Sequence, residues 1–154
     1  MPSAMFDSLV GPLCVTETDG AITTLSWHGA TTQTKSDRTA LLNLAIAQLD
    51  AYFAGELQVF DLPLYVAGSD FQRAVCDAML AIPLGETRTY GDIARDLKAP
   101  PQPVGNACGA NPIPVIIPCH RVLAANGLGG FSGQGGVETK VTLLKHEGAA
   151  SLLI

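Results

Sequence analysis

Residues 111–122 read Asn-Pro-Ile-Pro-Val-Ile-Ile-Pro-Cys-His-Arg-Val, and the interpretation of the whole chain starts from this stretch. Prolines fix the backbone direction around the apolar run 113–117, which predicts a short strand with Cys119 at its end. A reactive thiolate needs positive potential, a base within reach and partial access to solvent. Because His120 and Arg121 supply a base and charge, Cys119 is the candidate nucleophile.

Cys119 and His120 are neighbours in the chain, and neighbouring residues in regular structure do not face one another. They therefore need a local turn or a bridging water in order to act together. A catalytic base is best held by a third group. Glu147, at the end of a helix expected over 137–147, is the candidate, since a carboxylate at a helix C-terminus is disfavoured by the helix dipole and so indicates a specific partner.

Two short helices separated by a proline break precede this stretch. Thr89 caps the first, which runs to Leu97, and Ala99-Pro100-Pro101 breaks it. Pro103 fits the first turn of the second, expected over 104–110. The pair has a helix-turn-helix outline, whose second helix normally enters a DNA groove.

That second helix has poor intrinsic propensity, because Gly105, Asn106 and Gly109 each cost about 0.5–1 kcal/mol relative to alanine. One interpretation is a loop, or a helix held only by packing. The other is a helix with small side chains whose backbone approaches a ligand closely. The residues alone leave both open.

The first part of the chain has a different character. Strands are predicted over 13–18 and 21–28 with a turn between them, followed by a helix over 39–54 and an extended connector over 60–64. The second region is expected to begin near Gly68.

A helix opens this second region. Ser69 caps it and Gln72 is expected to complete a capping box, while Pro83 and Gly85 end it. Its predicted apolar face consists of Phe71, Val75, Met79 and Ile82.

The net charge of −5 is unevenly distributed. Residues 1–77 hold three basic and nine acidic side chains, whereas residues 78–154 hold six basic and five acidic ones. Any DNA-binding surface is therefore expected in the second half, although the weak field predicts little long-range steering.

The remaining composition excludes several classes of protein. None of the four cysteines forms a Cys-x-x-Cys pair and the three histidines are scattered, so no zinc site is expected, and Cys14, Cys76 and Cys108 are interpreted as small buried hydrophobes. No cofactor fingerprint is present. The absence of a long apolar run and of a basic leader segment predicts a cytoplasmic protein without a membrane span.

Pro118-Cys119-His120-Arg121-Val122 resembles the active-site motif of the O6-alkylguanine-DNA alkyltransferases. The resemblance runs from about Ala45 to Gly148. The shared motifs are Gln48-Leu49-Asp50-Ala51-Tyr52-Phe53-Ala54-Gly55, Phe60-Asp61-Leu62-Pro63-Leu64, Phe71-Gln72, Ile82-Pro83-x-Gly85, Thr89-Tyr90-Gly91-x-Ile93-Ala94, Asn111-Pro112 and Leu143-Leu144-x-His146-Glu147-Gly148.

The resemblance implies an α/β plus α fold in two lobes. An N-terminal ribonuclease H-like α/β lobe is expected over 1–67, and a C-terminal DNA-binding and alkyl-acceptor domain with a helix-turn-helix over 68–154. It also implies a monomer that repairs O6-alkylguanine in double-stranded DNA in a single turnover, with O4-alkylthymine as a second candidate lesion. Flipping of the damaged base is what the chemistry demands, because the target oxygen lies inside the base pair.

On matching positions, the resemblance implies that Cys119 accepts the alkyl group, His120 acts as base through a water and Glu147 orients His120. Tyr90 would protonate the departing guanine at N3, and Asn111 would brace the turn that carries Cys119. Further residues are implied to contact the base or the DNA: Val122, Phe131 and Ser132 in the pocket, and Gln102, Val104, Gly105, Gly109 and Arg121 toward the duplex. For Arg121, an internal ion pair is an equal alternative to a phosphate contact.

Two positions depart from the family pattern. Gln102 occupies the place of an arginine that fills the gap left by the flipped base, and glutamine lacks that charge. Phe131 replaces a frequent tyrosine. Two alternative functions follow: a lesion-binding protein with weak or no transfer, which the retained Cys119 disfavours and Gln102 favours, and a Cys-His-Glu hydrolase, for which no oxyanion-hole motif is recognisable.

Overall fold

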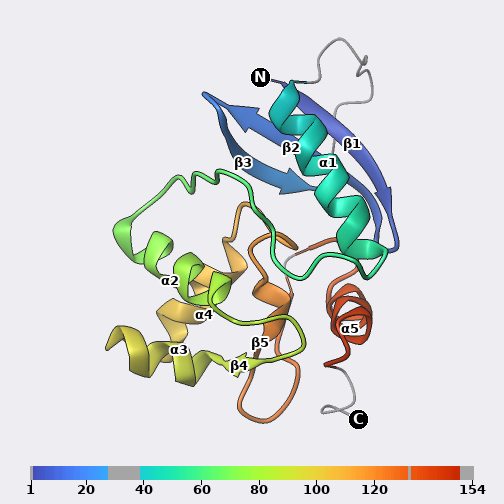
Figure 1. Cartoon of the computed structure of the whole chain (residues 1–154). Coiled ribbons are helices and arrows are strands. Elements are labelled where there is room, and N and C mark those ends of the chain that lie inside the picture. Colours follow the sequence, from blue (N-terminus) through green and yellow to red (C-terminus); the bar gives the residue numbers. More distant parts are fainter. Residues whose placement is uncertain (1, 28–38, 132, 150–154) are drawn as a thin grey trace.

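The computed structural model describes residues 2–27, 39–131 and 133–149. Three antiparallel strands, β1 (Ser3–Ser8), β2 (Gly11–Thr18) and β3 (Ala21–Ser26), form a sheet in the order β1-β2-β3. Helix α1 (Ala40–Phe53) lies across this sheet (Figure 1). Its buried residues Leu42, Ala45, Leu49 and Tyr52 recur at helical spacing, so one stripe of the helix faces inward.

Helices dominate the second lobe. They are α2 (Asp70–Leu80), α3 (Tyr90–Leu97), α4 (Pro101–Gly109) and α5 (Val137–His146), with the 3-10 turn η2 (Cys119–Arg121) between α4 and α5. The short strands β4 (Arg88–Thr89) and β5 (Val122–Leu123) pair in parallel. The predicted α/β plus α architecture, with a helix-turn-helix formed by α3 and α4, is confirmed.

Backbone hydrogen bonds and a shared core join the lobes. Within the first lobe, the connector pairs with β3 through an Ile22–Leu64 bridge. Between the lobes, the Leu25 amide of β3 donates to the Pro112 carbonyl at 2.9 Å. One cluster of buried side chains runs from the sheet through α1 into α2, α4 and the turn before Cys119. The segment that carries Cys119 is therefore fixed against both lobes. Among the described residues, no helix is long and apolar enough to cross a membrane.

Local sequence signals set the helix boundaries near the nucleophile. Thr89 and Asp92 form a reciprocal capping box at the start of α3, and Lys98 ends the helix in the left-handed region with a φ of 53°. Helix α4 begins at Pro101, three residues earlier than predicted. Both Pro101 and Pro103 fall in its first turn, where a missing N–H costs no intrahelical hydrogen bond.

Two local predictions are wrong. The run 113–117 is a tight turn and not a strand: Ile117 N–H donates to the Ile113 carbonyl at 2.8 Å, and Val115 has a φ of 72°. Prolines within the run remove the N–H groups that a strand ladder needs. Ser69 caps α2, but Gln72 does not complete the box, because its amide donates to the Ala107 carbonyl on α4 at 2.8 Å.

Candidate active site

Turn η2 places Cys119 at the centre of the second lobe. Cys119 N–H donates to the Ile117 carbonyl at 2.8 Å and Arg121 N–H donates to the Pro118 carbonyl at 3.0 Å, which closes one tight turn. The chain then pairs with β4 as strand β5. Of the two alternatives that the sequence left open, a local turn or a bridging water, the local turn is present.

Asn111 holds this turn from behind. Its side-chain amide donates to the Ile117 carbonyl at 2.8 Å, and its oxygen accepts from Ile113 N–H at 3.0 Å. The side chain is buried, so these bonds are sheltered from water. The geometry matches the bracing role expected for Asn111.

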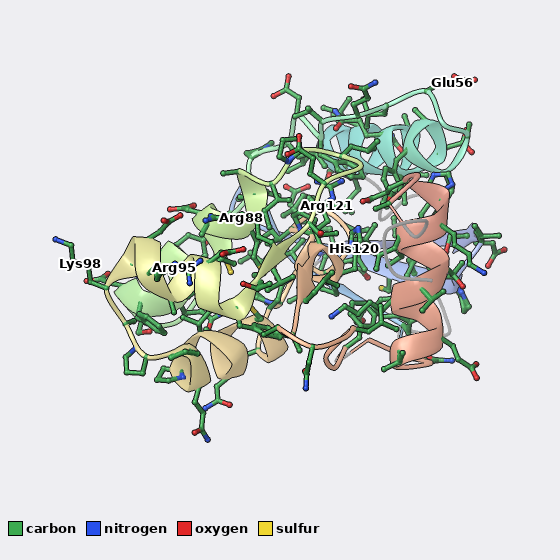
Figure 2. The ribbon with its side chains drawn as sticks, turned by 90° about the horizontal axis from the view of Figure 1, so that it is seen from below. Glu56, Arg88, Arg95, Lys98, His120 and Arg121 are labelled. Carbon is green, nitrogen blue, oxygen red and sulfur yellow. The ribbon has the colours of Figure 1, made fainter. Side chains whose placement is uncertain are left out.

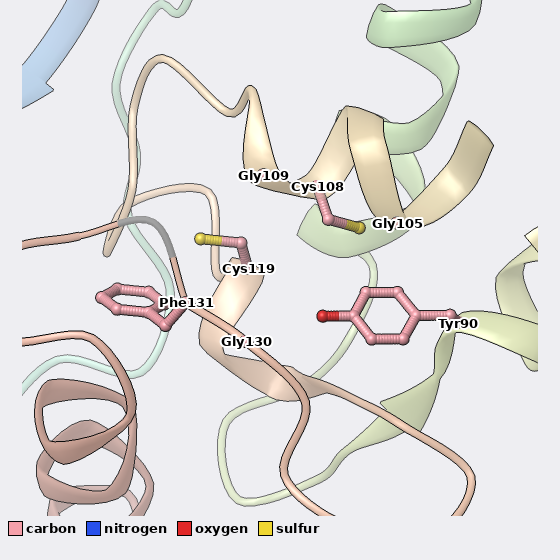
Figure 3. Close-up of a pocket in the computed structure, with 7 residues that line it drawn as sticks. All are labelled: Tyr90, Gly105, Cys108, Gly109, Cys119, Gly130 and Phe131. Atoms are coloured by element: carbon pink, nitrogen blue, oxygen red, sulfur yellow. The ribbon is translucent and has the colours of Figure 1, made fainter. Parts of the chain in front are cut away.

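Cys119 lines a pocket of about 260 Å³ (Figure 3). The Tyr90 hydroxyl points into it from one side, and the ring of Phe131 borders it on another. The remaining lining residues are Gly105, Cys108, Gly109 and Gly130. A Cβ on Gly109 would meet no atom within 4 Å, so the absent side chain leaves α4 open to the pocket. This supports the interpretation of α4 as a helix whose backbone a ligand can approach.

Glu147, at the C-cap of α5, contacts both residues that follow Cys119 in the chain, His120 and Arg121. Its Oε2 lies 2.7 Å from His120 Nε2. Arg121 donates from Nε to Oε1 at 2.8 Å and from Nη2 to Oε2 at 3.0 Å. Tyr52 of α1 donates its hydroxyl to Oε2 at 2.5 Å. The predicted contact between Glu147 and His120 is present, within a larger buried network.

The protonation states in this network follow from burial and hydrogen bonding. Burial raises the pKa of Glu147, but hydrogen bonds from His120 and Arg121 outweigh it and hold that pKa at about 2. Burial lowers the pKa of His120 below its ordinary value. Neutral His120 therefore donates its Nε2 proton to the carboxylate, which leaves Nδ1 unprotonated. Within the described residues, Nδ1 has no hydrogen-bond partner.

Cys119 itself is a neutral thiol in the free protein. Burial raises its pKa to about 11, opposed by hydrogen bonding from Asn111 and by the charge of Lys140. The sequence interpretation gave Arg121 a part in ionising the thiol. This is wrong, because the guanidinium is paired with Glu147 and also donates to the Ile82 carbonyl at 2.7 Å.

Lys140 is a site residue that the sequence did not indicate. Although fully buried, its ammonium donates to the carbonyls of Val122 and Gly130, at 2.7 and 3.0 Å, and lies 6.0 Å from the centre of the Tyr90 ring. It therefore fixes both ends of the loop that borders the pocket. Burial lowers the pKa of Lys140 to about 8.

Tyr90 is held by the same loop. A Cβ on Gly129 would lie 3.3 Å from the Tyr90 hydroxyl and 3.2 Å from the Ala124 amide nitrogen, and Gly129 has a φ of 72°, so glycine allows this close passage. Burial raises the pKa of Tyr90, which keeps the phenol protonated and able to donate.

The structure divides the residues that were expected to contact DNA. Gln102 and Gly109 are exposed on α4, and Gly105 is half-buried and lines the pocket. Three expectations need correction: the side chains of Val104 and Val122 lie in the core, and Arg121 is buried in its ion pair, so the internal alternative for Arg121 holds. Ser132 lies outside the described residues.

Three cations lie near the helix-turn-helix: Arg95 and Lys98 are exposed, and Arg88 is half-buried. Figure 2 shows Arg95 and Lys98 along α3, with Arg88 beside it and His120 and Arg121 further inside. Arg88 forms an ion pair with Asp96 at 2.8 Å, and Arg95 pairs with Asp92. Their signal in the sequence was only the modest excess of basic residues in the second half. Among the described residues, no cluster of three His, Cys, Asp or Glu side chains could hold a metal.

Two family models match consecutive parts of the chain. The model described as "6-O-methylguanine DNA methyltransferase, ribonuclease-like domain" matches residues 1–66, and "6-O-methylguanine DNA methyltransferase, DNA binding domain" matches residues 70–149. The second match contains Cys119, His120 and Glu147.

Individual relatives match over nearly the full chain. The methylated-DNA–protein-cysteine methyltransferase of Mycobacterium tuberculosis is 44% identical over 149 residues, covering 92% of this chain and 88% of the relative. That of Mycobacterium leprae is 41% identical, covering 96% and 94%. The crystal structure of Mycobacterium tuberculosis OGT in complex with DNA superposes with a TM-score of 0.82 at 43% identity, covering 95% of this chain and 92% of that one.

Proposed function

Because the chain belongs to the 6-O-methylguanine DNA methyltransferase family, we propose that it repairs O6-alkylguanine in DNA by moving the alkyl group irreversibly onto its own Cys119. One observation carries the proposal: Cys119 lines an open pocket, and the next residue, His120, forms a buried hydrogen bond with the Glu147 carboxylate. A soft sulfur nucleophile suits displacement at a saturated carbon and needs no cofactor or metal. O4-alkylthymine is a second candidate lesion.

Deprotonation of the thiol is the first step. His120 Nδ1 is the unprotonated nitrogen of a neutral ring whose Nε2 proton is engaged by Glu147. A water between Nδ1 and Cys119 Sγ would carry the thiol proton to the ring. Glu147 stabilises the resulting imidazolium, much as a carboxylate does in other nucleophile–base pairs.

The thiolate then attacks the alkyl carbon of the flipped base. A carbon–sulfur bond forms, and the carbon–oxygen bond at guanine O6 breaks. Tyr90 donates its proton to guanine N3, so that guanine departs neutral, and the proton taken up by His120 balances the tyrosinate. Water does not readily hydrolyse the thioether, so each molecule repairs one lesion.

The helix-turn-helix is the proposed contact to duplex DNA. Helix α4 presents exposed Gln102 at its first turn, and α3 presents Arg95 and Lys98. Cations beside a groove bind phosphate oxygens and position the protein. We also propose that the protein is a monomer and acts in the cytoplasm. The boundary between its α/β lobe and its DNA-binding lobe is proposed to lie near residue 67.

A titration tests this function. A fixed amount of duplex oligonucleotide with one O6-methylguanine is mixed with increasing protein, and the remaining lesion is counted after digestion. We expect the lesion to fall linearly and to disappear at one equivalent, with no loss for Cys119→Ala. Binding without loss of the lesion would replace the proposal by the lesion-binding alternative, and turnover beyond one equivalent would contradict the single-turnover mechanism.

A further inference from the structure

The last turn of α1 contributes a hydroxyl to the hydrogen-bond network of the C-terminal lobe. Tyr52 is 1% exposed, and its hydroxyl oxygen lies 2.5 Å from Glu147 Oε2, although the two residues are 95 positions apart. Figure 1 shows the end of α1 beside α5. Nothing in the proposed mechanism requires a group from the N-terminal lobe at this point.

Tyr52 can only donate in this contact. Burial, followed by the charge of Glu147, raises the pKa of the Tyr52 phenol, so it keeps its proton. Glu147 is ionised, with a pKa of about 2, so its oxygens only accept. Hydrogen bonds to a charged acceptor are stronger than neutral ones.

The donors are unequally divided between the two carboxylate oxygens. Oε1 accepts from Arg121 Nε. Oε2 accepts from Tyr52, from Arg121 Nη2 and from His120 Nε2. Tyr52 and His120 therefore share one oxygen. Each further donor stabilises the carboxylate charge and reduces its attraction for a proton on His120.

Tyr52 is fixed at both ends. His146, the neighbour of Glu147, donates from Nε2 to the Tyr52 carbonyl at 2.7 Å. The Tyr52 ring is enclosed by the rings of Phe53, Phe60 and His146, at centroid distances of 4.9, 5.4 and 5.1 Å. The backbone contact and the ring packing together direct the Tyr52 hydroxyl toward Glu147.

We propose that Tyr52 is a positioning residue for alkyl transfer: its phenol hydroxyl holds Glu147 in place and limits how strongly that carboxylate supports a proton on His120. This inference rests on the proposed function, because it concerns the base of that reaction. The charged and titratable groups acting on His120 are Glu147, Arg121 and Lys140, and those facing Tyr52 are Glu147, Arg121 and His146. The N-terminal lobe thereby sets the strength of a base located in the other lobe.

Removing the hydroxyl has a defined sign. In Tyr52→Phe, Glu147 Oε2 loses one donor and its charge acts more fully on His120. The imidazolium is then favoured, and the pKa of His120 rises. A protonated base cannot accept the thiol proton, so transfer fails at a higher pH than in the wild type.

The experiment has two readouts over pH 4–9. The rate of benzyl transfer from free O6-benzylguanine gives the acid limb of transfer, and ¹⁵N NMR of the histidine rings in the free protein gives the His120 midpoint. We expect Tyr52→Phe to raise the midpoint of the acid limb and the His120 titration midpoint by about 0.5–1 pH unit each. Tyr65→Phe is the matched control: it makes the same substitution at an exposed tyrosine whose hydroxyl faces Arg73 and not Glu147, so we expect both midpoints to stay unchanged.

Replacing Tyr52 with 3-fluorotyrosine is a second test, and it keeps the inference testable if the Tyr52→Phe protein does not fold. Fluorine makes the phenol a stronger donor at almost unchanged shape, so both midpoints should move down. Midpoints that stay within 0.2 pH unit of the wild type, or that move with the opposite sign, overturn the inference. If the wild type transfers no alkyl group, the proposed function fails, while the NMR midpoint still decides the role of Tyr52.

Discussion

At the scale of single residues, burial keeps Cys119 a neutral thiol in the free protein. Burial raises the pKa of its thiol to about 11, and the Arg121 guanidinium is engaged by Glu147. The candidate nucleophile is therefore not a permanently charged thiolate, although reactive cysteines often are.

This state predicts slow reaction of Cys119 with iodoacetamide in the absence of DNA. Only the thiolate is nucleophilic, so at pH 7.5 we expect a rate at least about tenfold below that of free cysteine, rising toward pH 11. Mass spectrometry of the Cys119 peptide over a pH series measures it. A rate that levels off below pH 8 would show a permanently activated thiol.

Lys140 is predicted to hold the pocket loop. In Lys140→Met the carbonyls of Val122 and Gly130 lose their donor, and each unsatisfied buried acceptor costs about 1–3 kcal/mol. We expect a lower urea midpoint and at least about tenfold slower benzyl transfer. Lys145→Met, on the exposed face of the same helix, is the control and should change neither. Wild-type stability in Lys140→Met would contradict the assignment.

At the scale of elements, α4 contributes to the site because glycines replace larger side chains where it borders the pocket. Gly109 leaves space beside Cys119, and α4 begins on prolines that cost it no hydrogen bond. The caps and breaks around α3 and α4 were predictable because capping and proline act through adjacent residues. The turn at 113–117 was not, because apolar composition is shared by buried strands and buried turns.

Gly109→Leu should therefore close the pocket with little effect on folding. The new side chain meets no existing atom near its Cβ, so stability should change by less than about 1 kcal/mol, whereas benzyl transfer should fall by about a hundredfold. Gly127→Leu, which is equally unobstructed but does not line the pocket, should keep wild-type transfer. Equal losses in both variants would show that the effect is not specific to the pocket.

Gln102→Arg tests the first turn of α4. Gln102 is exposed there, and an arginine would add one cation where the duplex is expected to lie. We expect faster repair of duplex DNA, with the gain shrinking as salt rises, and no change toward free O6-benzylguanine. An equal gain on both substrates would contradict a DNA-contacting role for this position.

At the scale of the whole molecule, the buried network couples the two lobes. Cys119, His120 and Glu147 could be proposed from the sequence because they belong to one compact motif and the adjoining helix end. Tyr52 and Lys140 could not: Tyr52 reads as one more apolar position of α1, and a lysine in a helix usually lies on its surface. A contact between the lobes gives Tyr52 its role, and contacts with carbonyls 10 and 18 residues earlier in the same lobe give Lys140 its role.

This coupling predicts acid-sensitive folding. The folded pKa of Glu147 is about 2, below its unfolded value, so its stabilisation is present above about pH 4.5 and is lost as pH falls toward 2. His120 has a lowered folded pKa, so the unfolded chain takes up that proton first and stability also falls below about pH 6.5. Urea midpoints should therefore decrease steadily from pH 7 to pH 3. For Glu147→Gln we expect a flatter curve, and an unchanged slope would contradict the linkage.

Location of the alkyl group most directly tests the account. The protein is reacted to completion with an O6-methylguanine oligonucleotide, digested, and the peptides of its four cysteines are weighed. We predict one methyl group on Cys119 and none on Cys14, Cys76 or Cys108. Repair of the lesion with Cys119 unmodified, or a methyl group on another cysteine, would contradict the account.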